Sequence, residues 1–300
     1  MQLIAYILAY PILWLISILP FRVLYFFSDC IYVLIYRIVG YRKKTVNQNL
    51  RLCLPNLTDA EYKAIEKKFY HHFCDNFLEM IKTMTISEKE MNKRFVFENI
   101  EVLHEYEKKG KSIAIMCAHY SSYEWLLIMN RYLINHKGFG IYKRLGNPYF
   151  DRLVRKIRGR VGAELIDTKE SVPIMLNNRR NGILGVYGFI SDQSPKIYRV
   201  PYWGKFFGME VPVHGGAEML AKKLDMNVIY VKGQKLSRGH YKATFIPFEG
   251  NPKEVPNFGL TDIFLRLLEE WITENPEYYL WTHKRFKHRR NDPPGYTPKA

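Results

Sequence analysis

Two residues in the middle of the chain have the types and the spacing of a proton-transfer pair. His119 follows a short apolar run, 112–117, and Glu124 stands five residues after it. Neutral imidazole can take a proton from a hydroxyl near pH 7, and a carboxylate bound to its far ring nitrogen fixes the tautomer and stabilises the imidazolium. The activated oxygen can then attack an acyl group without a covalent enzyme intermediate. The pair therefore indicates acyl transfer to a hydroxyl, with His119 as general base and Glu124 as its partner.

Other familiar kinds of site are disfavoured because their residues are missing. The sequence has no GxSxG, GxxxxGK[ST], GxGxxG or HExxH motif, which disfavours serine hydrolases, P-loop nucleotide hydrolases, dinucleotide enzymes and zinc proteases. The four cysteines have no CxxC spacing, so we expect free thiols and neither a zinc site nor a disulfide framework. We also expect no other metal and no cofactor. The His-x4-Glu spacing alone is weak, because nine histidines and an acidic frequency of about one in ten predict about one such match by chance. A structural histidine is the commoner alternative, so the surrounding elements have to decide.

The elements that must position this pair follow an α/β pattern. Short apolar runs alternate with stretches of helical periodicity, which is typical of a mixed sheet flanked by helices. We predict strands over 112–117, 138–142, 182–190, 227–232 and 241–247, and helices over 121–134, 147–158, 215–224 and 261–273. His119 and Asp192 then both lie at strand ends, where α/β sheets bind ligands. The helix predicted to begin at Ser121 would also offer free N–H groups to a phosphate or an oxyanion.

Residues 1–40 have the composition of a hydrophobic membrane anchor. The stretch Leu3–Leu19 carries no charge, and at about 1.5 Å per residue it is marginally long enough to cross a bilayer. A second apolar stretch, Val23–Val39, contains Asp29, so a buried or interfacial helix is an alternative to a second span. The pattern of a cleaved signal peptide is missing, and we expect the anchor to be retained. Spanning and re-entrant arrangements are both compatible with this pattern.

A basic cluster and a helical segment follow the anchor. By the positive-inside rule, the cluster places the rest of the chain on the cytoplasmic side. It consists of Arg37, Arg42, Lys43 and Lys44. The capping box Thr58–Glu61 then opens a long amphipathic helix with an aromatic stripe that we expect in the core. We therefore divide the chain into a membrane anchor, 1–40, and one catalytic domain, 41–300, with a helical entry segment, 41–100.

The chain is strongly basic. A formal charge of +16 and a pI near 9.5 bias it toward polyanionic partners such as nucleic acid, an anionic membrane or an acidic carrier protein. The basic residues follow no nucleic-acid-binding module, and the apolar N-terminus favours the membrane, so we expect no nucleic-acid partner. The basic run 283–290 would help to dock the domain on anionic lipid, at about 1 kcal/mol for each Lys or Arg near the surface.

Several sequence blocks, taken in order over essentially the whole chain, resemble the late acyltransferase family of lipid A biosynthesis, the lauroyl- and myristoyltransferases. Besides the uncharged N-terminus and the block from His119 to Glu124, they are Tyr142-Lys143, Asn147-Pro148, Arg158 with Gly162, Ser191–Pro195, Val200–Gly204, Gly216–Glu218 and Tyr279–Lys287. The resemblance implies a fold like that of glycerol-3-phosphate acyltransferases and a bacterial inner-membrane enzyme with a cytoplasmic active site. It also implies an acyl chain from acyl carrier protein or acyl-CoA, and a hydroxyl of a lipid A precursor as acceptor.

The resemblance also implies roles for individual residues. His119 and Glu124 match the family's catalytic pair, and Asp192 stands where the family has a frequently functional Asp. The substrate-binding residues implied are Lys143, Arg144, Arg158 and Asp192. The segment 142–145, Tyr-Lys-Arg-Leu, departs from the family's Tyr-Arg-Pro, and Lys cannot make the bidentate phosphate contact that Arg makes.

This departure leaves the acceptor open. A lysophospholipid or an aminolipid would need the same chemistry as a lipid A precursor. A non-catalytic lipid-binding or assembly protein of the membrane is a further alternative. A membrane glycosyltransferase is disfavoured, because the sequence has no DxD motif.

Overall fold

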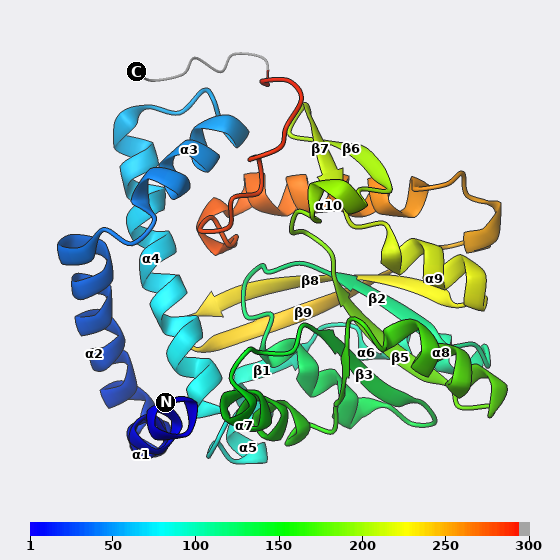
Figure 1. Cartoon of the computed structure of the whole chain (residues 1–300), viewed down its shortest axis with the longest axis horizontal. Helices are drawn as coiled ribbons and strands as arrows, with labels where there is room; N and C mark the ends of the chain where they lie inside the picture. Colours follow the sequence, from blue (N-terminus) through cyan, green and yellow to red (C-terminus); the bar gives the residue numbers. More distant parts are fainter. Residues whose placement is uncertain (294–300) are drawn as a thin grey trace.

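The computed structural model describes residues 1–293 and contains a seven-stranded sheet covered by helices on both faces (Figure 1). The strands lie in the order β1 (Phe95–Phe97), β9 (His240–Pro247), β8 (Asn227–Ser237), β2 (Ile113–Cys117), β5 (Gly185–Ile190), β3 (Lys137–Tyr142) and β4 (Glu164–Asp167). Neighbouring strands are parallel, except in the antiparallel β8–β9 hairpin. The predicted mixed α/β sheet is confirmed.

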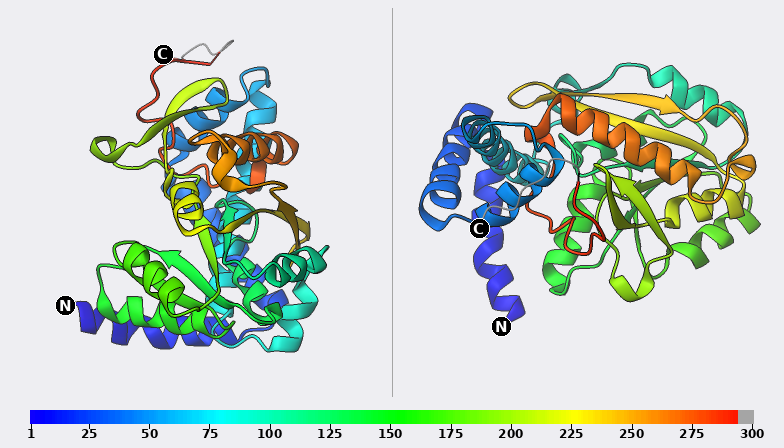
Figure 2. Two further views of the ribbon diagram at one scale, coloured as in Figure 1. Left: turned by 90° about the vertical axis from the view of Figure 1, so that its right-hand side faces the viewer. Right: turned by 90° about the horizontal axis from the view of Figure 1, so that it is seen from above.

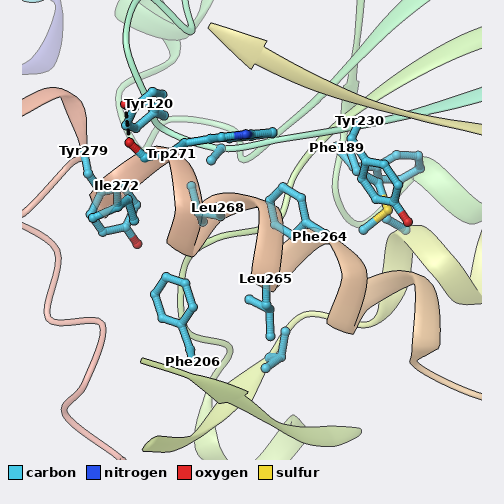
Figure 3. Packing of buried hydrophobic residues seen from close by; sticks show 14 of the residues in the cluster. Tyr120, Phe189, Phe206, Tyr230, Phe264, Leu265, Leu268, Trp271, Ile272 and Tyr279 are labelled. Carbon is cyan, nitrogen blue, oxygen red and sulfur yellow. Dashed lines mark hydrogen bonds between the residues drawn. The ribbon is translucent and has the colours of Figure 1, made fainter. Parts of the chain in front are cut away.

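Strand β2 divides the core into two layers because its side chains alternate between the faces of the sheet. All five of its residues are buried, as expected for a central strand covered on both sides. Ile113 and Ile115 pack with α5 (Glu88–Arg94), α6 (Ile100–Lys108) and the 3₁₀ segment η2 (Trp125–Tyr132). Ala114 and Met116 face the layer that holds α8 (Ser171–Arg180), α9 (Gly216–Leu224) and α10 (Gly259–Glu274). Figure 3 shows α10 directing Phe264, Leu268 and Trp271 into this second layer.

The remaining elements surround these layers. They are α1 (Gln2–Ile18), α2 (Phe21–Tyr32), the π-helical η1 (Val33–Val39), α3 (Lys43–Cys53), α4 (Asp59–Lys82), α7 (Pro148–Gly159), the antiparallel pair β6 (Tyr202–Phe206) and β7 (Met209–Val213), and the 3₁₀ turns η3 (Ile197–Arg199), η4 (Pro252–Glu254) and η5 (Pro276–Tyr278). The predicted capping box opens α4, with Thr58 and Glu61 bonded reciprocally. The aromatic stripe of α4 is only partly core, because Phe69 is buried and Phe77 is exposed.

The N-terminal helices α1 and α2 pack against α4, and α1 also contacts α7. Helix α1 runs beside α7 (Figure 2), where Tyr6 contacts the rings of Tyr149 and Phe150. Its C-terminal end is fixed by Lys82 of α4, whose Nζ donates to the carbonyls of Ser17 and Leu19 at 2.7 Å each. No single helix among residues 1–293 combines the length and the apolar composition needed to cross a bilayer; the segment Phe21–Val39 reaches them only jointly with α3, across a bend of 91°.

One predicted element differs in the structure. The helix expected over 121–134 is a loop followed by η2, so the helix N-terminus predicted beside His119 is not formed there. The cause lies at Ser121, whose φ of 54° is in the left-handed region and whose N–H donates to the Tyr278 carbonyl at 3.0 Å. An α-helical first turn cannot include a residue with this backbone. Trp125 then ties the segment to α4, because its Nε1 donates to the Glu79 carbonyl and the Thr83 hydroxyl.

Candidate active site

Two neighbouring parallel strands, β2 and β5, bring His119 and Asp192 together. Each residue lies two positions beyond its strand, and the register pairs Cys117 with Ile190 at the shared carboxyl edge. His119 Nδ1 lies 2.9 Å from Asp192 Oδ1, and the same oxygen accepts the His119 backbone N–H at 3.1 Å. The carboxylate is 2% exposed and the imidazole 20%. The acid is therefore enclosed, while the ring keeps a face toward a cavity.

Burial and charge act in opposite directions on this pair. Burial lowers the pKa of His119, but the charge and the hydrogen bond of Asp192 outweigh it and raise that pKa above 6.5. Burial would raise the pKa of Asp192, but the His119 ring and the backbone N–H lower it below 3.8. The Asp192 charge thus stabilises an imidazolium and holds Nδ1–H in place. Nε2 is left as the nitrogen that can exchange a proton with a substrate.

The hydrogen bond predicted between His119 and Glu124 is replaced by this contact with Asp192. Glu124 stands at the start of η2, where its carboxylate receives Arg158 of α7 in a bidentate pair, with N–O distances of 2.6 and 3.0 Å. A forked pair of this kind fixes the position and the orientation of both groups. The Glu124 charge still acts on the site, since it is among the causes that raise the pKa of His119. Arg158, predicted to bind substrate, therefore lies at the site as the partner of Glu124.

The loop after β3 carries the other two predicted substrate-binding residues. Lys143 and Arg144 are both exposed. Arg144 lies 3.4 Å from Asp167 and 3.7 Å from Glu170, so its charge is directed toward the β4 side of the sheet. The structure thus places this loop at the carboxyl edge of β3, two strands away from β2. Among the contacts of residues 1–293, none joins Lys143 or Arg144 to His119.

A C-terminal segment, Tyr278–Phe286, ties together the loops that carry His119 and Asp192. On the first loop, the Leu280 N–H donates to the His119 carbonyl at 3.2 Å. On the second loop, Ser194 donates its backbone N–H to His283 Nε2 at 3.2 Å and its hydroxyl to the Arg285 carbonyl at 2.7 Å. Burial is the main cause that lowers the pKa of His283 to about 4, so this ring is a neutral acceptor near pH 7.

Two further residues at the site were not predicted from the sequence. Gln193 places its amide within 3.5 Å of both ring nitrogens of His119. Arg285 is 1% exposed and donates Nη1 to the Pro212 carbonyl and the Ser194 hydroxyl, while its Nε and Nη2 find no hydrogen-bond partner among residues 1–293. Gln193 lies in the sequence block 191–195 and Arg285 in the block 279–287, but no motif within these blocks indicated a role for either side chain.

A cavity of about 80 Å³ opens beside the imidazole, and we call it the site cavity. Helix α4 supplies one wall, the loop after β2 a second, and the C-terminal segment a third. Its lining residues are Phe69, His72, Phe73, Asn76, Phe77, Met80, His119, Tyr123, Glu124, Tyr278, Tyr279 and Leu280. Most of this lining is apolar or aromatic, and the charged groups gather where His119 and Glu124 lie. In the described part of the chain, no group of three or more His, Cys, Asp or Glu residues could hold a metal ion.

The chain matches one protein family over most of its length. The model of the bacterial lipid A biosynthesis acyltransferase family matches residues 2–288. The chain belongs to this family. It is 24% identical over 281 residues to the lipid A biosynthesis lauroyltransferase of Escherichia coli K12, a match that covers 93% of this chain and 90% of that protein. It is 21% identical over 268 residues to a lipid A biosynthesis acyltransferase of Haemophilus influenzae, covering 84% and 79%. A lipid A biosynthesis myristoyltransferase of E. coli K12 matches over 151 residues at 22% identity.

Family membership makes the chain an acyltransferase and confirms the resemblance inferred from the sequence blocks. The candidate site combines an imidazole hydrogen-bonded to an enclosed carboxylate with a largely apolar cavity. This combination suits a reaction between a fatty thioester and a hydroxyl, because one side of the site must hold hydrocarbon while the other moves a proton.

Proposed function

We propose that this acyltransferase moves a fatty acyl chain from the thioester of acyl carrier protein or acyl-CoA onto a hydroxyl of a lipid A precursor. The observation that carries the proposal is the hydrogen bond between His119 and Asp192 at the mouth of an apolar cavity, in a member of a lipid A acyltransferase family. The names of its relatives, a lauroyltransferase and a myristoyltransferase, support a saturated acyl chain as the transferred group.

His119 acts as the general base in this reaction. Its Nε2 takes the proton from the acceptor hydroxyl as the oxygen attacks the thioester carbonyl, and the tetrahedral intermediate then expels the thiolate. The imidazolium returns the proton to the leaving sulfur. Asp192 keeps the ring oriented and stabilises its positive form, which is the role that the sequence assigned to Glu124.

Glu124 and Arg158 act together as a charged wall beside the imidazole. The carboxylate of Glu124 adds to the field that favours the imidazolium, and Arg158 holds that carboxylate in place through the ion pair. When an acceptor hydroxyl or a developing oxyanion arrives, the guanidinium offers N–H groups in a fixed geometry. Both residues are therefore assigned to transition-state stabilisation and acceptor positioning.

The acceptor has a second candidate, a lysophospholipid or an aminolipid. The segment 142–145 lacks the family's Tyr-Arg-Pro, and Arg144 is engaged with Asp167 and Glu170. A phosphate on a lipid A precursor would therefore meet Lys143 as a point charge instead of a guanidinium fork. A lysophospholipid or an aminolipid has a smaller headgroup and would therefore make fewer contacts with this loop.

One assay separates these functions. Purified enzyme is given an acyl-carrier-protein or acyl-CoA donor with an under-acylated lipid A precursor, a lysophospholipid or an aminolipid, and the acylated product is identified by mass spectrometry. We expect product with the lipid A precursor and its loss, by at least about 10²-fold, in His119→Ala. Product only with lysophospholipid or aminolipid would transfer the proposal to that acceptor. Lipid binding without any acylated product would support a non-catalytic role.

The membrane side of the proposal rests on the N-terminal helices. Exposed apolar side chains concentrate on α1, α2 and η1, and basic side chains stand beside them at Arg37, Arg42, Lys43 and Lys44. The exposed apolar residues include Ile4, Ile7, Leu8, Ile12, Phe26, Leu34, Ile38 and Val39. We propose that these helices attach the enzyme to the cytoplasmic face of the bacterial inner membrane, where apolar area and cationic attraction to anionic lipid add.

Vesicle flotation tests the attachment. The double variant Leu8→Glu/Phe26→Glu should lose binding to vesicles that contain anionic phospholipid, since both side chains are more than 60% exposed on these helices. The control Leu236→Glu changes an equally apolar side chain, 58% exposed, on the β8–β9 hairpin. Equal flotation of the double variant and the control would show that α1 and α2 do not attach the enzyme.

A further inference from the structure

The loops that follow β3 and β5 leave the sheet side by side, at the edge that carries His119. The two strands are parallel neighbours, and their register places Gly140 beside Gly188, so both chains reach the carboxyl edge together. Strand β5 pairs with β2 on its other side. Three loops therefore follow one another along this edge: the loop of His119, the loop of Asp192 and the loop that begins at Lys143.

The tips of the last two loops expose apolar side chains. On the loop after β5, Ile197 is 46% exposed and Tyr198 is 70% exposed. On the loop after β3, Leu145 is 43% exposed. A single exposed apolar side chain needs no explanation, but a group of them on adjacent loops marks a surface that another molecule or a membrane can cover. We call the two tips, residues 143–146 and 195–198, the edge loops.

Basic side chains accompany the apolar ones on the edge loops. Lys143 and Arg144 are exposed on the first loop and Lys196 on the second, and neither loop contains an Asp or a Glu. Arg144 offsets two acids beyond β4, since it lies 3.4 Å from Asp167 and 3.7 Å from Glu170. Exposed hydrocarbon next to cationic side chains is the composition of a surface that lies against anionic lipid, because apolar burial and charge attraction add.

Helix α1 connects the edge loops to the N-terminal helices. Asn147, directly after the first edge loop, donates Nδ2 to the Gln2 carbonyl at 3.2 Å, and Tyr6 stacks on Tyr149 with the ring centroids 5.8 Å apart. The same helix exposes apolar side chains such as Ile4, which is 61% exposed. Figure 2 shows α1 and the loop between β5 and β6 projecting on the same side of the molecule. The surface proposed above to attach the enzyme to the membrane therefore continues to the carboxyl edge of the sheet.

Resting on the function proposed above, we propose that the edge loops lie in the headgroup layer of an anionic membrane and hold the carboxyl edge of the sheet against it. This orientation brings the site cavity beside His119 close to the boundary between lipid and water, where the hydroxyls of a membrane lipid lie. The acceptor then reaches the imidazole by lateral movement within the bilayer. Its hydrocarbon stays out of water throughout, which removes the cost of extracting it.

A fluorescent label on the second edge loop tests the contact without any turnover. Tyr198→Cys is made in a Cys30→Ser background and labelled with the fluorophore NBD, whose emission rises in an apolar environment; the three other cysteines are buried. Vesicles that contain anionic phospholipid should raise the emission at position 198. Ile134→Cys in the same background is the matched control, because Ile134 is 62% exposed at the opposite, amino edge of β3. Its emission should stay constant.

The rate of acyl transfer gives a second readout. The double variant Ile197→Glu/Tyr198→Glu places two negative charges on the edge loop, which anionic lipid repels. The rate with the acceptor in anionic vesicles, divided by the rate with the acceptor in nonionic detergent micelles, should fall by at least about 10-fold. This ratio cancels any general loss of active enzyme. Ile134→Glu adds a charge at the opposite edge and should keep the wild-type ratio.

Three results would overturn the proposal: an emission at position 198 that does not respond to vesicles, an equal response at position 134, or a wild-type rate ratio in the double variant. A higher KM for an acyl-carrier-protein donor with an unchanged rate ratio would assign the edge loops to the donor instead. If the wild-type enzyme acylated no lipid while the emission at position 198 still rose, the proposed function would be refuted and the membrane contact would stand.

Discussion

The substitution Asp192→Asn removes the charge that holds His119 while keeping the shape of the side chain. Asp192 is 2% exposed, so water cannot take the place of its carboxylate beside His119 unless the loop rearranges. The amide can still accept one hydrogen bond, but it no longer enforces the tautomer with the proton on Nδ1. We expect kcat/KM on the pH plateau to fall by about 10²- to 10⁴-fold, which corresponds to about 3 to 5 kcal/mol of transition-state stabilisation.

The pH profile should change in a defined direction. A general base must be neutral, so the wild-type rate rises with pH through the pKa of His119, which Asp192 raises above 6.5. In Asp192→Asn the lowering effect of burial is no longer outweighed by that charge. The acid limb of the pH–rate profile, where the rate rises with pH, should therefore move to lower pH, and the rate on the plateau should fall. Initial rates measured from pH ~5 to pH ~9 provide both quantities.

Glu124→Gln is the comparison that decides between the two carboxylates. Glu124 acts on His119 through charge alone, and among the causes that raise the His119 pKa it stands after Asp192. Its substitution should move the acid limb less than Asp192→Asn does, although it also releases Arg158. The reasoning is refuted if Asp192→Asn keeps its activity within about 3-fold and its acid limb unchanged. A larger shift of the limb in Glu124→Gln would restore Glu124 as the direct partner of His119.

Three further predictions concern groups away from the imidazole. Arg285→Ala should lower kcat by about 10-fold with little change in KM, because the Ser194 loop loses the guanidinium that fixes it, and an unchanged kcat would argue against a positioning role. Arg238→Ala should lower the free energy of unfolding by about 1 to 3 kcal/mol, because Asp75 stays buried without its main partner. Denaturant unfolding measures this loss, which should be below about 0.5 kcal/mol for the exposed control Lys68→Ala. Burial raises the pKa of Glu79 from 4.5 to about 7, so its ionisation should lower stability by about 3 kcal/mol as pH rises through that interval. Glu79→Gln should remove this dependence from the Tm-versus-pH curve, and an unchanged curve would show that Glu79 does not ionise there.

The strand ends were predictable because they follow from local patterns. The apolar runs before His119 and Asp192 identify two buried strands, and parallel neighbours place their carboxyl ends at one edge. The sequence therefore placed both residues at the ends of strands, and the structure shows these two ends side by side. Spacing also predicted that Glu124 lies near His119, because only four residues separate the two, and both line the site cavity.

The partner of His119 was not predictable from spacing. It depends on the left-handed backbone of Ser121 and on the hydrogen bond from that residue to Tyr278, a contact between segments far apart in the sequence. These contacts replace the expected helix with a loop, and Glu124 then meets Arg158. The buried Arg285 escaped notice for a similar reason, since a basic run near the C-terminus resembles a solvated tail until the fold shows which of its charges is enclosed.

Mass spectrometry of the total lipid of cells tests the central claim most directly. Cells with the wild-type protein, without it, and with His119→Ala or Asp192→Asn in its place would be compared, with the amount of each protein in the membrane checked. The account predicts a lipid A species short by one acyl chain in the cells that lack the protein and in both variants, and its absence in the wild type. Unchanged lipids in all four, or a complete lipid A in the His119→Ala cells, would contradict acyl transfer by this site.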